Sequence, residues 1–440
     1  MSLPKRSLGM LLMALVTTAA GQASSLCAPL SEVTEAVLPT SAARPSAPNQ
    51  RKRTVTRDRR IVSERIAVVG AKVITVDADN TVHTPGMVIT EDGIIEYVGP
   101  PKELDSRTRK IDVGESWIIP GLVDLHTHIH GNGYNDMVQA VNPELRASPD
   151  FGQHNWYIKR GCAAGVTTLF GIPGSGTNMG GFGIIYKAKT SGGFDSCVVA
   201  DPGGLKVAQD SNPNRYRNIW DIGISRAGMT WILSDVNDRA KAAVEQGRND
   251  PALKWLKQVH SQELPVLIHT AGSEGVVNTA RMWRVTYDTR AVLSHGSFDG
   301  WMVAEAVAKI GIPVNHGPRT IDYYSSRNGR INGSAAAYQA ADPDNFSLNT
   351  DSGVVPQEEF FLQGSMGARY GGDGYGMLRA LTIHPARAIG IDHRVGSLEV
   401  GKDADIVVRA GNPLDPRNPV ELVLIDGEVH YDSEVDGQWF

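Results

Sequence analysis

Hydrophobic and polar positions change their rhythm along the chain. Between residues 61 and 118, short runs rich in β-branched residues, such as Ile66–Gly70 and Gly86–Thr90, are separated by Gly, Asn, Asp and Pro. This pattern predicts a meander of strands joined by tight turns. Residues 393–440 return to the same pattern, for example in Ala404–Val408. We therefore expect the two segments to pair into one small flanking β-sandwich.

The segment between them, residues 119–392, has a different rhythm. Short apolar runs alternate with longer stretches of helical periodicity, such as Ala240–Gln246 and Met302–Ile310. Repetition of strand and helix over this length suits a (β/α)8 TIM-type barrel, whose typical size is about 250 residues. A doubly wound open sheet is the alternative that the rhythm leaves open.

The first 60 residues follow neither rhythm. Lys5 and Arg6 precede an apolar run, Leu8–Val16, and small residues lead to Ala23, which is typical of a secretory signal peptide over residues 1–23. The run is too short to span a bilayer, and a short buried helix is the alternative. Residues 24–60 are rich in Ser, Pro, Ala and Arg, which predicts a flexible lead-in. We expect an exported protein, periplasmic or secreted, with no stable membrane span after signal removal.

Composition narrows the possible partners. The hydrophobic fraction of 41% and the charged fraction of 21% are ordinary for a soluble globular protein. A formal net charge of −5 gives no reason to expect nucleic acid, which favours a small-molecule substrate. Three cysteines, Cys27, Cys162 and Cys197, are too few for a disulfide framework, and no two have the spacing of metal ligands. A homo-oligomer remains open.

The first chemical signal is a histidine pair. His126 and His128 follow the apolar run Leu122–Leu125, and side chains two residues apart on a strand point the same way. In a barrel, the C-terminal ends of the strands carry the active site. Two neutral imidazoles fixed in this way make half of a zinc site, although the His-x-His pattern alone is weak.

Three later residues extend this signal. His269 ends the apolar run that starts at Leu264, and His295 ends the run that starts at Ala291. A lone histidine at a strand end is more often structural, but two of them downstream of the histidine pair favour a shared metal site. Asp351 follows late in the barrel. A carboxylate there could ligate the metal and move a proton, although a helix N-cap is the ordinary role of such an Asp.

Lys206 is the remaining candidate. An ammonium cannot bind a cation, but a desolvated lysine loses its proton readily. The neutral amine can take up carbon dioxide and become a carbamate, an anionic group with two oxygens that can bridge two metals. From its spacing alone, Lys206 is an ordinary loop lysine.

Together these residues resemble the amidohydrolase superfamily, in particular its imidazolonepropionase-like and dihydroorotase-like branches. The resemblance runs from about residue 61 to the end. It rests on the motifs Pro120-Gly-Leu-Val-Asp-Leu-His-Thr-His128, Ala164-Gly-Val-Thr-Thr168 and Gly396-Ser-Leu-Glu-Val-Gly-Lys-Asp-Ala-Asp405. Members with a closer likeness carry a Leu-Lys followed by an Asn-Pro, which here are Leu205-Lys206 and Asn212-Pro213.

The resemblance implies a site and a reaction. His126, His128 and Asp351 would bind one metal, and His269 and His295 a second. Lys206, as a carbamate, would bridge the two ions. The implied reaction is hydrolysis of an amide, peptide or cyclic amide C–N bond by attack of a metal-bound hydroxide, with Asp351 shuttling the proton. Zinc suits these ligands, as do manganese, iron and cobalt, and one or two ions per chain are open.

Substrate and reaction class stay open at this stage. Arg226, Arg319, Tyr323 and Tyr324 are candidate anchors for a substrate carboxylate, and each could equally be a salt-bridge or packing residue. One alternative is a mononuclear deaminase of the same superfamily, but its His-x-x-Glu motif is absent, because the first acid after His269 is Glu274. The other is a non-catalytic binding protein on the same scaffold.

Overall fold

The computed structural model of the chain describes residues 65–132, 135–215, 222–321, 329 and 331–440. The expected signal peptide and lead-in lie outside these residues, as do Tyr323 and Tyr324. Export therefore stays a prediction. None of the helices in the described part of the chain has the length and apolar character needed to cross a bilayer.

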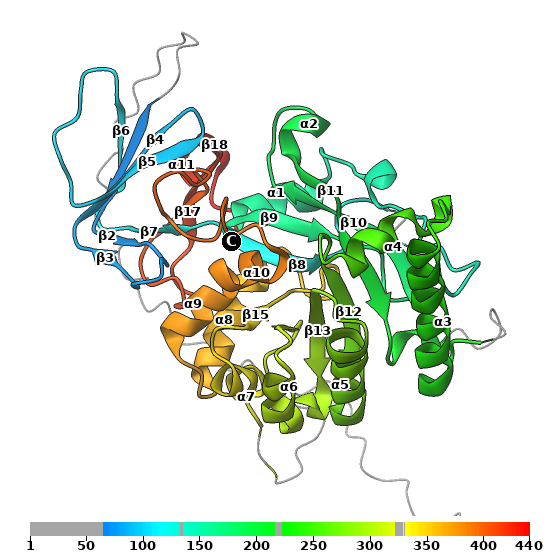
Figure 1. Cartoon of the computed structure of the whole chain (residues 1–440). Helices are drawn as coiled ribbons and strands as arrows, with labels where there is room; N and C mark the ends of the chain where they lie inside the picture. The colour runs from blue at the N-terminus through cyan, green and yellow to red at the C-terminus, as the bar shows by residue number, and fades with distance from the viewer. Residues whose placement is uncertain (1–64, 133–134, 216–221, 322–328, 330) are drawn as a thin grey trace, which may run out of the picture. The chain divides into compact units, whose positions relative to one another are not determined.

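The centre of the fold is a sheet of eight strands in the order β15-β14-β13-β12-β11-β10-β9-β8 (Figure 1). These strands span Leu122–Thr127 (β8), Val166–Gly171 (β9), Met179–Lys187 (β10), Val198–Ala208 (β11), Val266–Ala271 (β12), Ala291–Ser297 (β13), Val314–His316 (β14) and Phe346–Leu348 (β15). The segment after β15 returns to β8, where Thr127 bridges Ser352 and the His128 N–H donates to the Ser352 carbonyl oxygen at 2.5 Å. These contacts complete the barrel, and the expected TIM-type fold is confirmed.

One strand departs from the regular strand–helix repeat. β10 runs antiparallel to both of its neighbours, β9 and β11, whereas the other neighbouring strands of the barrel pair in parallel. Residues 172–178, which join β9 to β10, are rich in Gly and too few for a crossover helix. A parallel connection needs about a dozen residues or more, so the chain turns back on itself here.

Helices surround the barrel strands (Figure 1). Several begin at a side-chain cap: the Ser225 hydroxyl accepts from the Gly228 N–H, and the Asp373 carboxylate accepts from the Gly376 N–H. The helices span Trp156–Ala163 (α1), Phe194–Cys197 (α2), Arg226–Glu245 (α3), Lys254–His260 (α4), Ser273–Ala280 (α5), Ala304–Ile310 (α6), Ser334–Ala341 (α7), Phe360–Arg369 (α8), Gly374–Leu381 (α9), Ile383–Ile389 (α10) and Ser433–Asp436 (α11).

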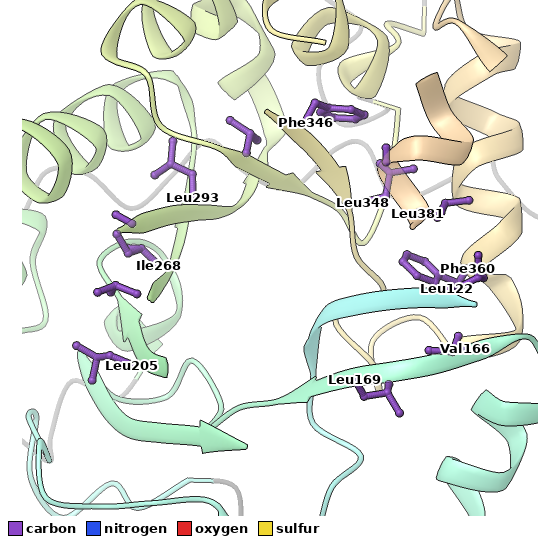
Figure 2. Close-up of a cluster of buried hydrophobic side chains, with 14 of the residues drawn as sticks. Leu122, Val166, Leu169, Leu205, Ile268, Leu293, Phe346, Leu348, Phe360 and Leu381 are labelled. Atoms are coloured by element: carbon purple, nitrogen blue, oxygen red, sulfur yellow. The ribbon is translucent and has the colours of Figure 1, made fainter. Parts of the chain in front are cut away.

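The barrel strands bury side chains on both of their faces. Figure 2 shows the layer that packs between strands and helices, which includes Leu205, Ile268 and Leu293. A second cluster, with Val123, Phe170, Leu267 and Val292 among its members, is separate from the first. Because neighbouring residues on a strand point to opposite faces, Leu293 lies outside the barrel wall and Val292 inside it.

A β-sandwich flanks the barrel, as the sequence predicts. One sheet has the order β5-β4-β1-β6 and comes from the N-terminal segment alone, whereas the other, β18-β17-β16-β7-β2-β3, joins both ends of the described chain. Val68 and Ile118 of the first segment share a core with Ile406 and Leu424 of the second. The strands span Ile66–Gly70 (β1), Lys72–Ile74 (β2), Val82–His83 (β3), Gly86–Glu91 (β4), Ile94–Gly99 (β5), Arg109–Asp112 (β6), Trp117–Pro120 (β7), Ile406–Arg409 (β16), Val420–Ile425 (β17) and Glu428–Asp432 (β18).

Candidate metal centre

The side chains that the sequence marks as metal ligands come from the C-terminal halves or ends of five different strands. β8 carries one of them and ends one residue before the next, β11, β12 and β13 carry one each, and the segment after β15 carries the last. This is the end of the barrel at which (β/α)8 enzymes hold their active sites. The residues are His126, His128, Lys206, His269, His295 and Asp351.

The Asp351 carboxylate is the point at which three imidazoles meet. Its Oδ1 lies 3.3 Å from His126 Nε2 and 3.2 Å from His128 Nε2, and its Oδ2 lies 3.8 Å from His295 Nε2. The carboxylate is largely buried. Burial alone would raise the pKa of Asp351, but interaction with His295, His128 and Lys206 outweighs it and lowers that pKa. Asp351 is therefore ionised at neutral pH.

Lys206, on β11, completes the cluster. Its Nζ lies 2.9 Å from His126 Nε2, and the side chain is fully buried. Burial lowers the pKa of Lys206 to about 7, and the charge of Asp351 opposes this only in part. A substantial fraction of this lysine is the neutral amine near pH 7, which is the form that can react with carbon dioxide.

The outer nitrogens of the three imidazoles are held by oxygen atoms. Nδ1 of His128 donates to the Ile172 carbonyl oxygen at 2.9 Å, and Nδ1 of His295 donates to that of Gly317 at 3.1 Å. Nδ1 of His126 lies 2.5 Å from the Ser294 hydroxyl. Placing the proton on Nδ1 in each ring leaves the Nε2 lone pairs facing Asp351.

The buried rings are neutral at physiological pH. Burial lowers the pKa of His126 well below its usual value, with Lys206 contributing, and burial lowers the pKa of His295 to about 4. Within the described part of the chain, His295 Nε2 has no hydrogen-bond partner. A buried ring nitrogen that faces a carboxylate and lacks a donor is suited to a cation.

His269 stands at the edge of this group. Its ring centroid lies 4.6 Å from that of His295, and its Nε2 lies 3.4 Å from the Ser211 hydroxyl. Asp351 lies within 4 Å of the other three imidazoles. The arrangement thus consists of a tight group around Asp351 with one more imidazole beside it.

These residues fit a divalent cation. Ligand atoms of His126, His295 and Asp351 all lie within 4.8 Å of one another. Imidazole nitrogens and a carboxylate oxygen are the donors that zinc, manganese, iron and cobalt accept in proteins. The hydrogen bonds at Nδ1 orient the rings, as outer partners of metal-binding histidines usually do.

Comparisons with known proteins bear on this centre. The amidohydrolase family model matches residues 219–431. A crystal structure of an amidohydrolase from Thermotoga maritima superposes with a TM-score of 0.75 at 27% identity and covers 83% of this chain and 100% of that one. The imidazolonepropionase of Sphingopyxis alaskensis is 23% identical over 402 residues, which are 85% of this chain and 95% of that protein.

This chain belongs to the amidohydrolase superfamily. A further relative, an amidohydrolase of Hapsidospora irregularis, is 22% identical over 395 residues, or 80% of this chain. The match spans only 40% of that relative's length. Members of the superfamily usually bind divalent metals, which agrees with the donor set around Asp351.

The expected substrate anchors are placed differently from the candidate metal ligands. Arg226 donates to the buried carboxylate of Asp210 at 2.9 Å and to the exposed carboxylate of Glu274 at 3.0 Å, so it has the salt-bridge role that the sequence left open. Arg319 is exposed on the segment after β14. Tyr323, like Tyr324, lies outside the described residues.

Several residues around the centre were not singled out from the sequence. Asp124 accepts from the Thr350 hydroxyl at 2.6 Å and from the Gln357 amide at 3.0 Å, which links β8 to the segment that carries Asp351. Burial raises the pKa of Asp124 to about 6. His316 donates from Nδ1 to the His295 carbonyl oxygen at 2.6 Å. The available signal was position, since His316 ends an apolar strand as the ligand histidines do.

Proposed function

We propose that this superfamily member is a divalent-metal-dependent hydrolase that cleaves a C–N bond in an amide, a peptide or a cyclic amide. The convergence of three imidazoles on the Asp351 carboxylate, with the Lys206 amine beside His126, carries the proposal. When bound, a divalent cation supplies Lewis-acid chemistry, because it acidifies water and polarises a carbonyl oxygen.

In this proposal the protein's own side chains bind the metal ions and move the protons. His126, His128 and Asp351 hold one ion, and His269 and His295 hold a second. Asp351, ionised at neutral pH, accepts the proton of the attacking water and returns it to the leaving nitrogen. The buried rings stay neutral and so keep their Nε2 lone pairs available.

Lys206 enters the proposal as a carbamate. Its Nζ lone pair attacks the carbon of CO2, a C–N bond forms, and the amine proton leaves to solvent. The product carries one negative charge on two oxygens, which suits a bridge between two ions. The full burial of Lys206 and its position 2.9 Å from His126 Nε2 support this role.

A deaminase is the rival within the superfamily. Curated 5-methylthioadenosine/S-adenosylhomocysteine deaminases match parts of the chain, for example at 29% identity over 96 residues for the Shouchella clausii protein. Proton transfer in such a reaction needs an acid inside the site. Glu274 has a side chain that is 84% exposed and pairs with Arg226, so it does not fill this role.

A substrate and metal screen tests the proposal. The full chain, loaded with zinc or manganese, is assayed on dipeptides, N-acyl amino acids and cyclic imides, and amine, carboxylate and ammonia release are measured separately. We expect amine or carboxylate release that chelators abolish and metal restores. Ammonia release alone would identify a deaminase. Protein that binds no metal and hydrolyses nothing would support a binding protein and contradict the proposal. In the same assays, the variant Asp351→Asn tests the proposed proton carrier. Asp288→Asn, which changes an exposed carboxylate, is its matched control.

A further inference from the structure

His295 is on the inner side of the barrel although its place on β13 predicts the outer side. Val292 belongs to the inner cluster, and the Ser294 hydroxyl contacts His126, so both face inward. Leu293 packs between the strand and the helices. Strict alternation would turn His295 outward with Leu293, away from Asp351.

A local break in the strand reverses this direction. His295 has a φ of 84°, in the left-handed region, and Gly296 follows with a φ of 58°. The pairing of β12 with β13 skips Gly296, since Thr270 pairs with His295 and Ala271 with Ser297. This is a β-bulge, a device that re-aims a side chain beside a site. The result is a ring 4.3 Å from that of His126, measured between centroids.

A residue other than glycine rarely adopts this backbone conformation, and it does so at a cost in energy that surrounding contacts must offset. Two carbonyl groups of the bulge are bonded from the outer side. His316, the register partner of His295 on β14, donates from Nδ1 to the His295 carbonyl oxygen at 2.6 Å. Tyr338 of α7 donates its hydroxyl to the Gly296 carbonyl oxygen at 3.0 Å.

His316 is itself fixed from behind. Its Nε2 lies 2.8 Å from the hydroxyl of Ser334, the first residue of α7, and its ring packs 5.2 Å from that of Tyr338, between centroids. The imidazole is fully buried. Its two ring nitrogens are thus engaged by the His295 carbonyl oxygen and the Ser334 hydroxyl, outside the group around Asp351.

We propose that His316 is a positioning residue: its hydrogen bond to the His295 carbonyl holds the bulge that turns His295 into the metal centre. The inference rests on the proposed metal-binding role of His295. Without the bond, β13 relaxes toward regular alternation, and the His295 ring leaves the group around Asp351.

Two amide variants of His316 separate the effect of its hydrogen bond to His295 from the effect of its side-chain volume. In His316→Asn the amide nitrogen stands where Nδ1 stood and can still donate to the His295 carbonyl. In His316→Gln the amide reaches the Nε2 position and meets Ser334 instead. We expect metal affinity close to wild type for Asn and about 10- to 100-fold weaker for Gln, the range seen for outer partners of metal ligands. Tyr338→Phe should have a smaller effect of the same sign.

The readout is cobalt binding, followed by its visible absorption spectrum and by metal analysis, on proteins whose folding is checked by circular dichroism. A Gln variant with wild-type affinity and spectrum overturns the inference. Crystal structures of the metal-free variants decide the point independently. The His295 ring should face Asp351 in wild type and the Asn variant and should turn away in the Gln variant. An unmoved ring in the Gln variant refutes the positioning role, whereas wild-type protein without metal affinity refutes the proposed function alone.

Discussion

Two buried lysines on neighbouring strands of the barrel have opposite surroundings. Lys187, on β10, is surrounded by carboxylates: its Nζ lies 2.7 Å from Asp405, 2.9 Å from Asp403 and 3.2 Å from Asp426. Lys206, on β11, faces an imidazole instead, with its Nζ 2.9 Å from His126 Nε2. Both side chains are almost completely shielded from solvent.

The comparison shows that neighbouring charges decide what burial does to an amine. Burial would lower the pKa of Lys187, but Asp405, Asp426 and Asp403 outweigh it and raise that pKa. Burial lowers the pKa of Lys206 to about 7, because Asp351 is the one carboxylate that opposes it. Lys187 is therefore a cation at neutral pH that joins barrel and sandwich, whereas Lys206 is partly neutral near pH 7.

The largest expected effect comes from removing the carboxylate beside Lys206. Asp351→Asn takes away the proposed proton carrier, so kcat/KM should fall by about 10²–10⁴-fold. Asp288→Asn, a change at an exposed carboxylate, should leave kcat/KM within a factor of about two. Steady-state assays on the best substrate of the screen provide the measurement. Retention of more than a tenth of the activity in Asp351→Asn would exclude the proton role.

Removal of the structural lysine should act on stability instead. Lys187→Met leaves the buried Asp405 carboxylate without its cation, whereas Asp403 keeps Arg394 and Asp426 keeps Lys189. Breaking a buried ion pair by removing one partner costs about 3–5 kcal/mol. We expect this loss in the free energy of unfolding, measured by urea denaturation with the same metal load. Metal content per folded chain should not change. A variant that keeps its stability but loses metal would reverse the roles assigned to the two lysines.

The sequence predicted which histidines gather at the strand ends because their signals are local. His126, His128, His269 and His295 each end an apolar run, and a parallel barrel gathers such ends at one face. The same logic could not give the direction of β10, since alternation is identical in parallel and antiparallel strands. The short, Gly-rich connection 172–178 between β9 and β10 is the one local feature that indicates the antiparallel direction of β10.

Other features depend on contacts between distant segments. Arg226 pairs with Asp210 and Glu274, and nothing in its sequence context distinguishes this from a substrate anchor. The reversal of His295 needs a positive φ and a bulge. A glycine in a sequence indicates that a positive φ is possible, but a histidine gives no such indication. The sequence also contains no signal for Lys187, because the carboxylates around it lie more than 200 residues away in the chain.

The third expected effect, in order of size, comes from replacing Lys206 itself. Lys206→Met replaces a buried amine by an apolar side chain of similar length, so stability of the metal-free protein should not decrease. Metal affinity should fall by at least about 100-fold, or about 2.7 kcal/mol, if the carbamate is a ligand. Metal analysis and cobalt titration measure this. Partial rescue of activity of Lys206→Ala by short carboxylic acids would support a carbamate, and unchanged metal content in either variant would rule out the bridging role.

The smallest effect concerns a single member of the carboxylate group. Asp426→Asn leaves Lys187 with Asp405 and Asp403, and Asp426 is only partly buried, so the loss should be about 1 kcal/mol.

Burial would raise the pKa of Asp426, but Lys187 and Lys189 outweigh it and lower that pKa below its usual 3.8. A lowered carboxylate pKa stabilises the fold above the usual value and loses this contribution as pH falls through the lowered one. The difference between wild type and Asp426→Asn should therefore be constant from about pH 5 to pH 9 and shrink below pH 4. It should not shrink between pH 7 and pH 9, because the raised pKa of Lys187 keeps that cation charged until above pH 10.5. Urea denaturation across this range tests both limits, and a difference that already fades near neutral pH would mean that Lys187, like Lys206, loses its proton when buried.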